Sequence, residues 1–94
     1  MSYKLLFKVD ALKEWKSLDN SIRKQFLRKL KERIINPRVG QSRLSGLKNC
    51  YKIKLRGSGY RLVYEVRDSQ LIISVVAVGK RERNLVYKAA IKRI

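Results

Sequence analysis

The chain has 94 residues, of which 45% are hydrophobic and 33% charged, a composition typical of one folded globular domain with no room for a second. Its charge is extreme, because 24 Lys and Arg against 7 Asp and Glu give a net charge of +17. So large a charge on a small body repels itself and is typical of proteins that bind a polyanion. A single cysteine excludes a disulfide framework and a zinc site, and the lack of histidine excludes Ser-His, Cys-His and paired-histidine chemistry.

The first residues of the chain predict a strand and a short helix. Alternate side chains from Tyr3 to Val9 are apolar, which is the period-two pattern of a strand. Asp10 is a candidate N-cap for a helix that turns Leu12 and Trp15 inward. The charges here are too closely spaced for a signal peptide, and no apolar run in the chain is long enough to span a membrane. We therefore expect a cytoplasmic protein with no membrane partner.

A longer helix follows, for which Asp19 and the next two residues offer a cap. Its apolar residues recur every four positions, as the core-facing stripe of a helix does: Ile22, Phe26, Leu30 and Ile34. Its other side carries basic residues, which we expect in solvent: Arg23, Lys24, Arg28, Lys29, Lys31 and Arg33. Asn36 and Pro37 predict the end of this helix, and residues 38–49 have the composition of a loop.

The second half of the chain is rich in strand patterns. Three segments have strand character: residues 50–56, 60–67 and 71–78. The first two predict a hairpin, because a loop at Gly57 and Ser58 suits a type II′ turn with glycine first. The third follows a turn at residues 68–70, is apolar on both faces like a strand covered from both sides, and should end at Gly79.

Residues 84–94 predict a closing helix with Tyr87, Ile91 and Ile94 on one stripe. We therefore expect an α+β fold, with one domain over residues 1–94 in the order β-α-α-β-β-β-α. Its parts should be a small, mainly antiparallel sheet, an N-terminal helical pair and a C-terminal helix.

The hairpin predicts a crowded basic face. Burying the apolar residues of both strands on one face pairs Lys54 with Arg61 and Ile53 with Leu62. The opposite face then collects four cations: Lys52, Lys54, Arg56 and Arg61. Like charges directly opposite destabilise a sheet by a few tenths of a kcal/mol or more, so phosphate binding would explain the cluster. A solvated face on a very basic protein would look the same, and the residues alone leave both interpretations open.

A functional basic face would suit RNA cleavage without histidine. A neighbouring cation disfavours the charged form of a lysine, so a crowded lysine can accept a proton. RNA supplies its own nucleophile, the 2′-hydroxyl, so cleavage by deprotonation and phosphate stabilisation would need no metal or other cofactor.

Three further features each allow a purely structural and a functional interpretation. The run of residues 80–83, Lys-Arg-Glu-Arg, is either a charged start of the last helix or a contact to phosphate. Tyr87 is either a core aromatic residue or a platform on which a nucleobase stacks. A lone Cys50 without histidine is expected to be a small buried hydrophobic residue rather than a nucleophile.

Several runs of the sequence resemble the RelE-type toxins of the RelE/ParE superfamily. They are residues 11–15, 50–56, 59–64, 78–83 and 86–87. The resemblance extends over the whole chain and implies the fold predicted above. It also implies a bacterial-type toxin that enters the ribosomal A site and cuts the mRNA codon there. The 2′-hydroxyl of the second codon nucleotide would attack the phosphate that follows it.

The resemblance also implies an active site of Lys52, Lys54, Arg61, Arg81 and Tyr87. Lys54 would be the general base, and Arg81 would assist the leaving 5′-oxygen. Lys52 and Arg61 would neutralise the transition-state phosphate, and Tyr87 would stack on the codon. The division of proton transfer among Lys52, Lys54 and Arg81 stays open. We predict further RNA contacts from Arg56, Lys80 and Arg83.

The same resemblance implies the partners. They are a RelB-like antitoxin with an acidic tail, and the ribosome, bound at its A site together with the mRNA; the toxin–antitoxin complex would bind operator DNA through the antitoxin. One position departs from the family pattern, since Ser45 stands where the best-known member has a basic residue. The alternative is a non-catalytic basic binding module, either a gyrase-directed ParE-like toxin, which lacks the catalytic set, or a small nucleic-acid-binding protein.

Overall fold

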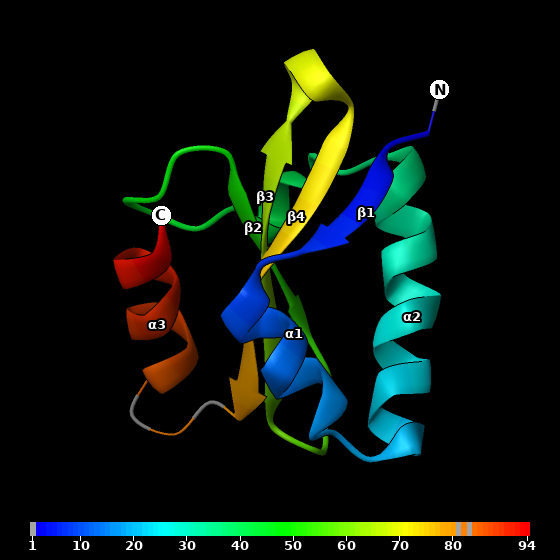
Figure 1. Ribbon diagram of the computed structural model, residues 1–94, viewed down its shortest axis with the longest axis vertical. Helices are drawn as coiled ribbons and strands as arrows, with labels where there is room; N and C mark the ends of the chain where they lie inside the picture. Colours follow the sequence, from blue (N-terminus) through cyan, green and yellow to red (C-terminus); the bar gives the residue numbers. More distant parts are fainter. Residues whose placement is uncertain (1, 81, 83) are drawn as a thin grey trace.

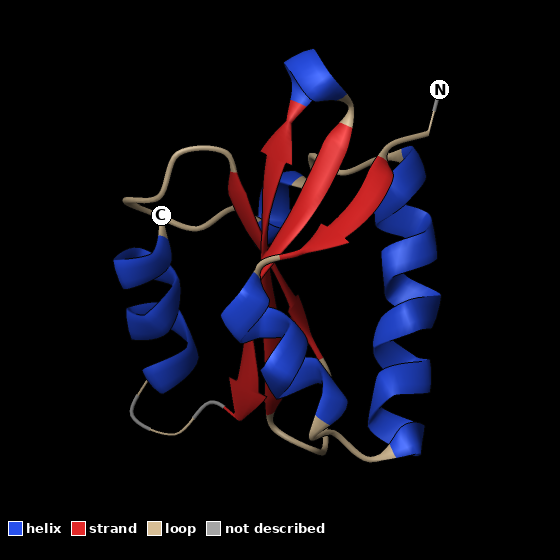
Figure 2. Cartoon of the chain, viewed as in Figure 1, coloured by secondary structure: helices blue, strands red, loops and turns tan. Residues whose placement is uncertain are grey.

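The computed structural model describes residues 2–80, 82 and 84–94. Its helices and strands are β1 (Lys4–Phe7), α1 (Val9–Lys16), α2 (Asn20–Ile35), β2 (Cys50–Lys54), β3 (Tyr60–Arg67), β4 (Ile72–Lys80) and α3 (Leu85–Arg93). Short 3-10 turns lie at Gly40–Ser42 and Asp68–Gln70. The sheet has the order β1-β4-β3-β2, in which β1 runs parallel to β4 and the other pairs are antiparallel (Figures 1 and 2). The predicted α+β class and element order are confirmed.

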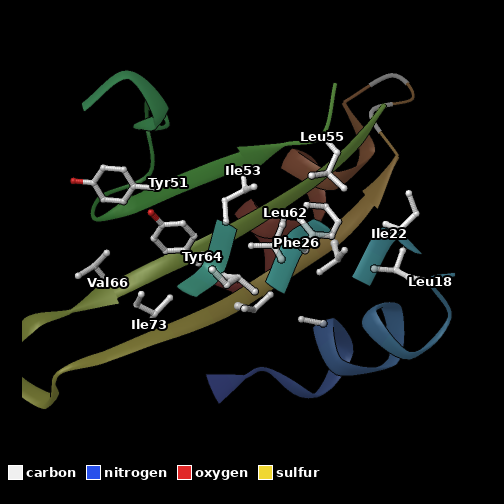
Figure 3. Close-up of a cluster of buried hydrophobic side chains, with 14 residues drawn as sticks. Leu18, Ile22, Phe26, Tyr51, Ile53, Leu55, Leu62, Tyr64, Val66 and Ile73 are labelled. Carbon is white, nitrogen blue, oxygen red and sulfur yellow. The ribbon is translucent and has the colours of Figure 1, made fainter. Parts of the chain in front are cut away.

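The sheet separates two helical layers. Helices α1 and α2 pack on one face and α3 packs on the other (Figure 1). The larger core lies between the sheet and the helical pair, where Phe26 of α2 meets Ile53, Leu62 and Tyr64 (Figure 3). Leu30 of α2 is fully buried in the same cluster. None of the described helices is long and apolar enough to cross a membrane.

The predicted course of α2 is confirmed. The helix begins after Asp19 and ends at Asn36, next to the proline that cannot continue it. Of its four-residue stripe, Ile22, Phe26 and Leu30 are buried, while the last member packs at the edge of the core.

Helix α1 differs from the prediction in its first turn. Lys8 is the N-cap, so Asp10 lies in the first turn of the helix and does not cap it. There its negative charge interacts favourably with the positive end of the helix dipole. Ala11 is fully buried, while Leu12 is 37% exposed. The smaller side chain lets the helix lie close to the sheet. Trp15 points inward as predicted, with its ring 5.2 Å from that of Phe7.

Two predictions for the C-terminal half are wrong. Strand β4 does not end at Gly79 but continues to Lys80, because Gly79 still pairs with a residue of β3. The buried residues of α3 are Val86 and Ala90, whereas Ile91 is 59% exposed and Ile94 50%. Short side chains at the contact let α3 approach the sheet, and this rotates the larger apolar stripe toward solvent.

The hairpin has the predicted register. Ile53 pairs with Leu62 and Lys54 with Arg61. The turn between them contains Gly57 with a φ of 88°, a left-handed conformation that favours glycine.

Candidate functional site: a basic groove beside the last helix

The alternation of β2 and β3 places three predicted site residues on the face that α3 covers. Cys50 and Val63 are buried under α3, and Lys52 and Arg61 follow them at even spacing on the same face. Lys54 lies at the end of β2, directly opposite Arg61. The cross-strand pair of cations predicted from the sequence is therefore present.

A groove of about 370 Å³ opens beside these cations. It is lined by Arg43, Leu44, Ser45, Leu47, Lys52, Lys54, Tyr87 and Ile91. The loop before β2 and the strand β2 itself therefore meet helix α3 here, more than 30 residues further along the chain. Of the five predicted active-site residues, Lys52, Lys54 and Tyr87 share this groove.

Tyr87 lies between the core and the groove. Its ring packs against the small core under α3, yet the side chain is half-buried and lines the groove. A ring supported from below by core residues is a rigid platform for a planar ligand.

Arg61 extends the cationic surface along the sheet. Its Nη1 donates a hydrogen bond 3.0 Å long to the carbonyl oxygen of Tyr60, while its buried Nε has no partner among the described residues. The next residue across the sheet is Gly79, where an added Cβ would meet nothing within 4 Å. There is therefore space beside Gly79, the cross-strand neighbour of Arg61.

Lys80 does not join this cluster. It pairs with Tyr60, and its Nζ lies 5.6 Å from the centroid of the Tyr60 ring. Since Tyr60 packs against the core of α1 and α2, Lys80 belongs to the opposite face of the sheet. Arg56 is exposed in the turn after Lys54. The predicted site residues Arg81 and Arg83 lie outside the described residues.

A network behind the groove was missed from the sequence. Arg33 was predicted to face solvent, but its Nη1 donates to the hydroxyl of Tyr64 at 2.8 Å and to the carbonyl of Lys52 at 3.3 Å. Its Nη2 donates to Ser42 Oγ at 3.2 Å, and the Tyr64 hydroxyl donates to the carbonyl of Pro37 at 2.6 Å. Arg33 thus connects α2 to the strand that carries the site lysines. No local pattern marks this role, because all its partners are nine or more residues away.

The groove residues of the loop were also missed. Arg43 forms an isolated bridge with Tyr51, which lays the loop beside the edge of β2. Leu44 and Leu47 pack against the core under α3. Two leucines in an otherwise polar loop are the signal that could have predicted this contact.

The described lining of the groove carries three basic side chains, those of Arg43, Lys52 and Lys54. Glu65, the acidic residue of the hairpin, forms an ion pair with Arg67 at a distance of 3.1 Å.

Cys50 is fully buried. Its burial, and to a lesser extent the nearby charge of Glu65, raises the pKa of its thiol to about 11. Its burial is as predicted, and a buried thiol with a raised pKa is a poor nucleophile. No group of three His, Cys, Asp or Glu side chains among the described residues is placed to hold a metal ion.

The side chains of this site are of the kinds that proteins use to bind nucleic acids. In general, lysine carries a compact charge that suits phosphate, arginine a planar donor group, and tyrosine a ring on which a base can stack. The fold and this groove together define a small basic α+β module of the kind that binds a polyanion.

Comparison with known proteins identifies the family. Residues 5–85 match the family described as the ParE toxin of type II toxin–antitoxin systems. The chain is 57% identical to a RelE-like toxin protein of Escherichia coli and 51% identical to the mRNA interferase toxin RelE of E. coli K12. In both cases the match covers 100% of this chain and 99% of the relative. The chain therefore belongs to the RelE/ParE family of toxins, and the predicted resemblance is confirmed.

Solved structures agree with this assignment. A variant of the E. coli RelE toxin in the free state superposes with a TM-score of 0.93 at 49% identity, covering 100% of this chain and 99% of that one. The same variant in complex with an antitoxin RelB peptide gives a TM-score of 0.84, also at 49% identity, with 100% and 99% coverage.

Proposed function

We propose that this chain is the toxin of a type II toxin–antitoxin system and cleaves mRNA in the ribosomal A site. The observation that carries the proposal is the groove in which Lys52, Lys54 and Tyr87 meet. These are three of the residues that the resemblance assigns to catalysis. The 51% identity over the full chain to an mRNA interferase supports it.

The groove suits cleavage by the RNA's own hydroxyl. Lys54 removes the proton from the 2′-hydroxyl, whose oxygen attacks the adjacent phosphorus. The P–O5′ bond breaks, the 5′-oxygen takes up a proton, and the other product is a 2′,3′-cyclic phosphate. Lys52 and Arg61 stabilise the charge that develops on the phosphate, and Tyr87 holds the base by stacking.

Arg61 fits this role because of its unpaired Nε. A guanidinium donor that is buried without a partner costs stability, so a ligand or a small shift that supplies the partner is favourable.

The alternative is a non-catalytic module, as in gyrase-directed toxins. The matching family description names the ParE toxin, which keeps this alternative open at the level of the family. Two relatives that match along the whole chain are named mRNA interferase RelE. In addition, the proposed cleavage gives Lys52, Lys54 and Tyr87 each a role, whereas a non-catalytic module would not need this set. These two observations favour the nuclease.

The proposed activity implies the partners. The toxin acts in the cytoplasm on ribosomes engaged with mRNA. A RelB-like antitoxin, of the kind seen with the intact E. coli RelE, would inhibit it by laying acidic residues over the groove cations and would bring the complex to operator DNA.

The decisive experiment maps cut sites on an mRNA with and without translating ribosomes. We expect cuts within A-site codons only when ribosomes are present, because the chain depends on a partner to align the 2′-hydroxyl with the phosphate. Lys54→Ala should abolish the cuts. Lys29→Ala is the matched control, since it removes the same charge from the exposed side of α2, on the far side of the sheet.

Efficient cutting of short naked RNA at physiological salt would contradict ribosome dependence. Equal loss of activity in both variants would show that overall charge, and not the groove, carries the effect. Binding without any cut on ribosomes would favour the non-catalytic module.

A further inference from the structure

Helix α3 has a modest apolar contact with the rest of the protein. Its buried residues are Val86 and Ala90, which belong to one cluster with Val63, Val76 and Ala77 of the sheet. Tyr87 and Ala89 are only partly buried against this cluster. Because its two fully buried side chains are short, hydrophobic contact alone holds this terminal helix weakly.

A charged contact supplements it at the end of the helix. Arg93 reaches back to Glu14 of α1, with Nη1 to Oε1 at 2.7 Å and Nη2 to Oε2 at 3.1 Å, a two-pronged ion pair. Nε of Arg93 lies 3.8 Å from the carboxylate of Asp10. The side chains of Arg93 and Glu14 are only 21% and 33% exposed, so the pair is partly shielded from solvent.

The pair also bonds to the backbone of β4. Nη1 of Arg93 donates to the carbonyl oxygen of Val76 at 2.9 Å, and Glu14 Oε1 accepts the N–H of Val78 at 3.1 Å. Among the described residues, the pairing of β1 with β4 ends at Phe7 and Val75. The two side chains therefore fill the strand edge where β1 stops. Each charge has a specific backbone partner, which a surface ion pair lacks.

We propose that Arg93 is a positioning residue, which through Glu14 and β4 holds α3 against the sheet and so keeps Tyr87 at the groove. The role in cleavage rests on the proposed function, since Tyr87 matters only if RNA stacks on it. The holding of α3 does not. It is a property of the free protein and can be measured without RNA.

Hydrogen exchange of the free protein tests the holding of α3. In Arg93→Ala, amides of α3 should exchange about 10- to 100-fold faster than in the parent, because charge-assisted bonds that close the helix are lost. Amides of β3 serve as the internal reference and should change much less. Lys92→Ala, which removes the same charge from the neighbouring exposed residue, should leave α3 unchanged.

Two further variants refine the test. Arg93→Lys keeps the charge but loses the planar fork, so its α3 amides should exchange at an intermediate rate, and it replaces Arg93→Ala if that variant does not fold. The double variant Glu14→Arg with Arg93→Glu, which exchanges the two charges, should not restore protection of the α3 amides. The N–H of Val78 would then face an arginine in place of an acceptor, and the carbonyl of Val76 would face a carboxylate in place of a donor.

Kinetics on ribosomes test the effect on Tyr87. If Arg93→Ala only lowers the fraction of docked α3, bound mRNA restores docking, so KM should rise while kcat is largely kept. Tyr87→Ala should instead lower kcat, because the ring itself is missing. Unchanged exchange of α3 in Arg93→Ala, or an equal acceleration in β3, would overturn the proposal. Absence of cleavage in the parent protein would overturn the proposed function alone.

Discussion

The hydroxyl of Tyr64 offers a sharp test of the network behind the groove. Tyr64 is fully buried, and its hydroxyl donates to the carbonyl of Pro37 at 2.6 Å and accepts from Arg33 at 2.8 Å. Burial, opposed by Arg33, raises the pKa of this phenol, so it remains protonated and able to donate at neutral pH. Tyr64→Phe removes both bonds and keeps the ring in the core.

The cost can be worked out from these contacts. Pro37 is buried, so its carbonyl loses a partner that water cannot easily replace, and Arg33 keeps only its longer bonds to Lys52 and Ser42. Leaving such groups unsatisfied costs about 1–3 kcal/mol, so we expect a loss of about 2 kcal/mol in the free energy of unfolding. For a domain of this size that corresponds to a fall of about 8–16 °C in Tm.

Tyr51→Phe is the matched control. The Tyr51 ring stacks on Tyr64 at 5.8 Å, but its hydroxyl accepts one bond, 3.3 Å long, from Arg38. Arg38 keeps its 2.6 Å ion pair with Asp68, so this variant should lose only about 0.5 kcal/mol.

Urea unfolding followed by the fluorescence of Trp15 measures both variants, since this ring lies 6.2 Å from that of Phe26 in the core. Equal losses in the two variants, or a loss below about 0.5 kcal/mol for Tyr64→Phe, would refute the reasoning. Because Arg33 keeps its bond to the Lys52 carbonyl, the folded Tyr64→Phe protein should still cleave mRNA.

Three other predictions concern pH, space and reactivity. Hydrogen bonds from Tyr3 and Arg38 lower the pKa of Asp68 below its usual 3.8, so its contribution to stability is present above about pH 4 and is lost as pH falls through the folded-state pKa; urea unfolding of Asp68→Asn should show a weaker acid dependence. Gly79→Ala should be neutral or stabilise the fold by up to about 1 kcal/mol in thermal melts, because an added Cβ meets nothing within 4 Å. Gly79→Leu should place a larger side chain beside Arg61 and lower cleavage in cut-site mapping, while thermal melts show that the protein stays folded. Cys50 should resist iodoacetamide at pH 8 in the folded protein and react after unfolding, so rapid labelling of the native state would contradict its burial.

The parts of the fold that the sequence predicts are those governed by local periodicity. The four-residue stripe of α2 and the two-residue alternation of the hairpin each act over a few positions. The core-facing side of α2 and the register of the hairpin were therefore predicted correctly, although β2 ends at Lys54 and not at residue 56. The pairing of Lys54 with Arg61 followed from the hairpin alone.

The remaining features depend on contacts between distant segments. Arg33 bonds to Tyr64, 31 residues away, and Arg93 bonds to Glu14, 79 residues away. The sequence favoured Ile91 over Ala90 as a core residue of α3 because isoleucine is the more hydrophobic of the two. In the structure Ala90 is buried and Ile91 is exposed, because α3 lies close to the sheet. That distance depends on tertiary packing and cannot be predicted from a local pattern.

The net charge of +17 is therefore a poor guide to the site when it is considered alone. Several arginines are used inside the fold, since Arg33 binds carbonyl and hydroxyl oxygens and Arg38 and Arg93 bind carboxylates. Those ion pairs occupy Asp68 and Glu14, which lie away from the groove. The structure distinguishes the cations that stabilise the fold from those that line the groove. Arg33, Arg38 and Arg93 bond to other parts of the protein, whereas Lys52 and Lys54 line the groove. The net charge counts both kinds together and therefore cannot locate the site.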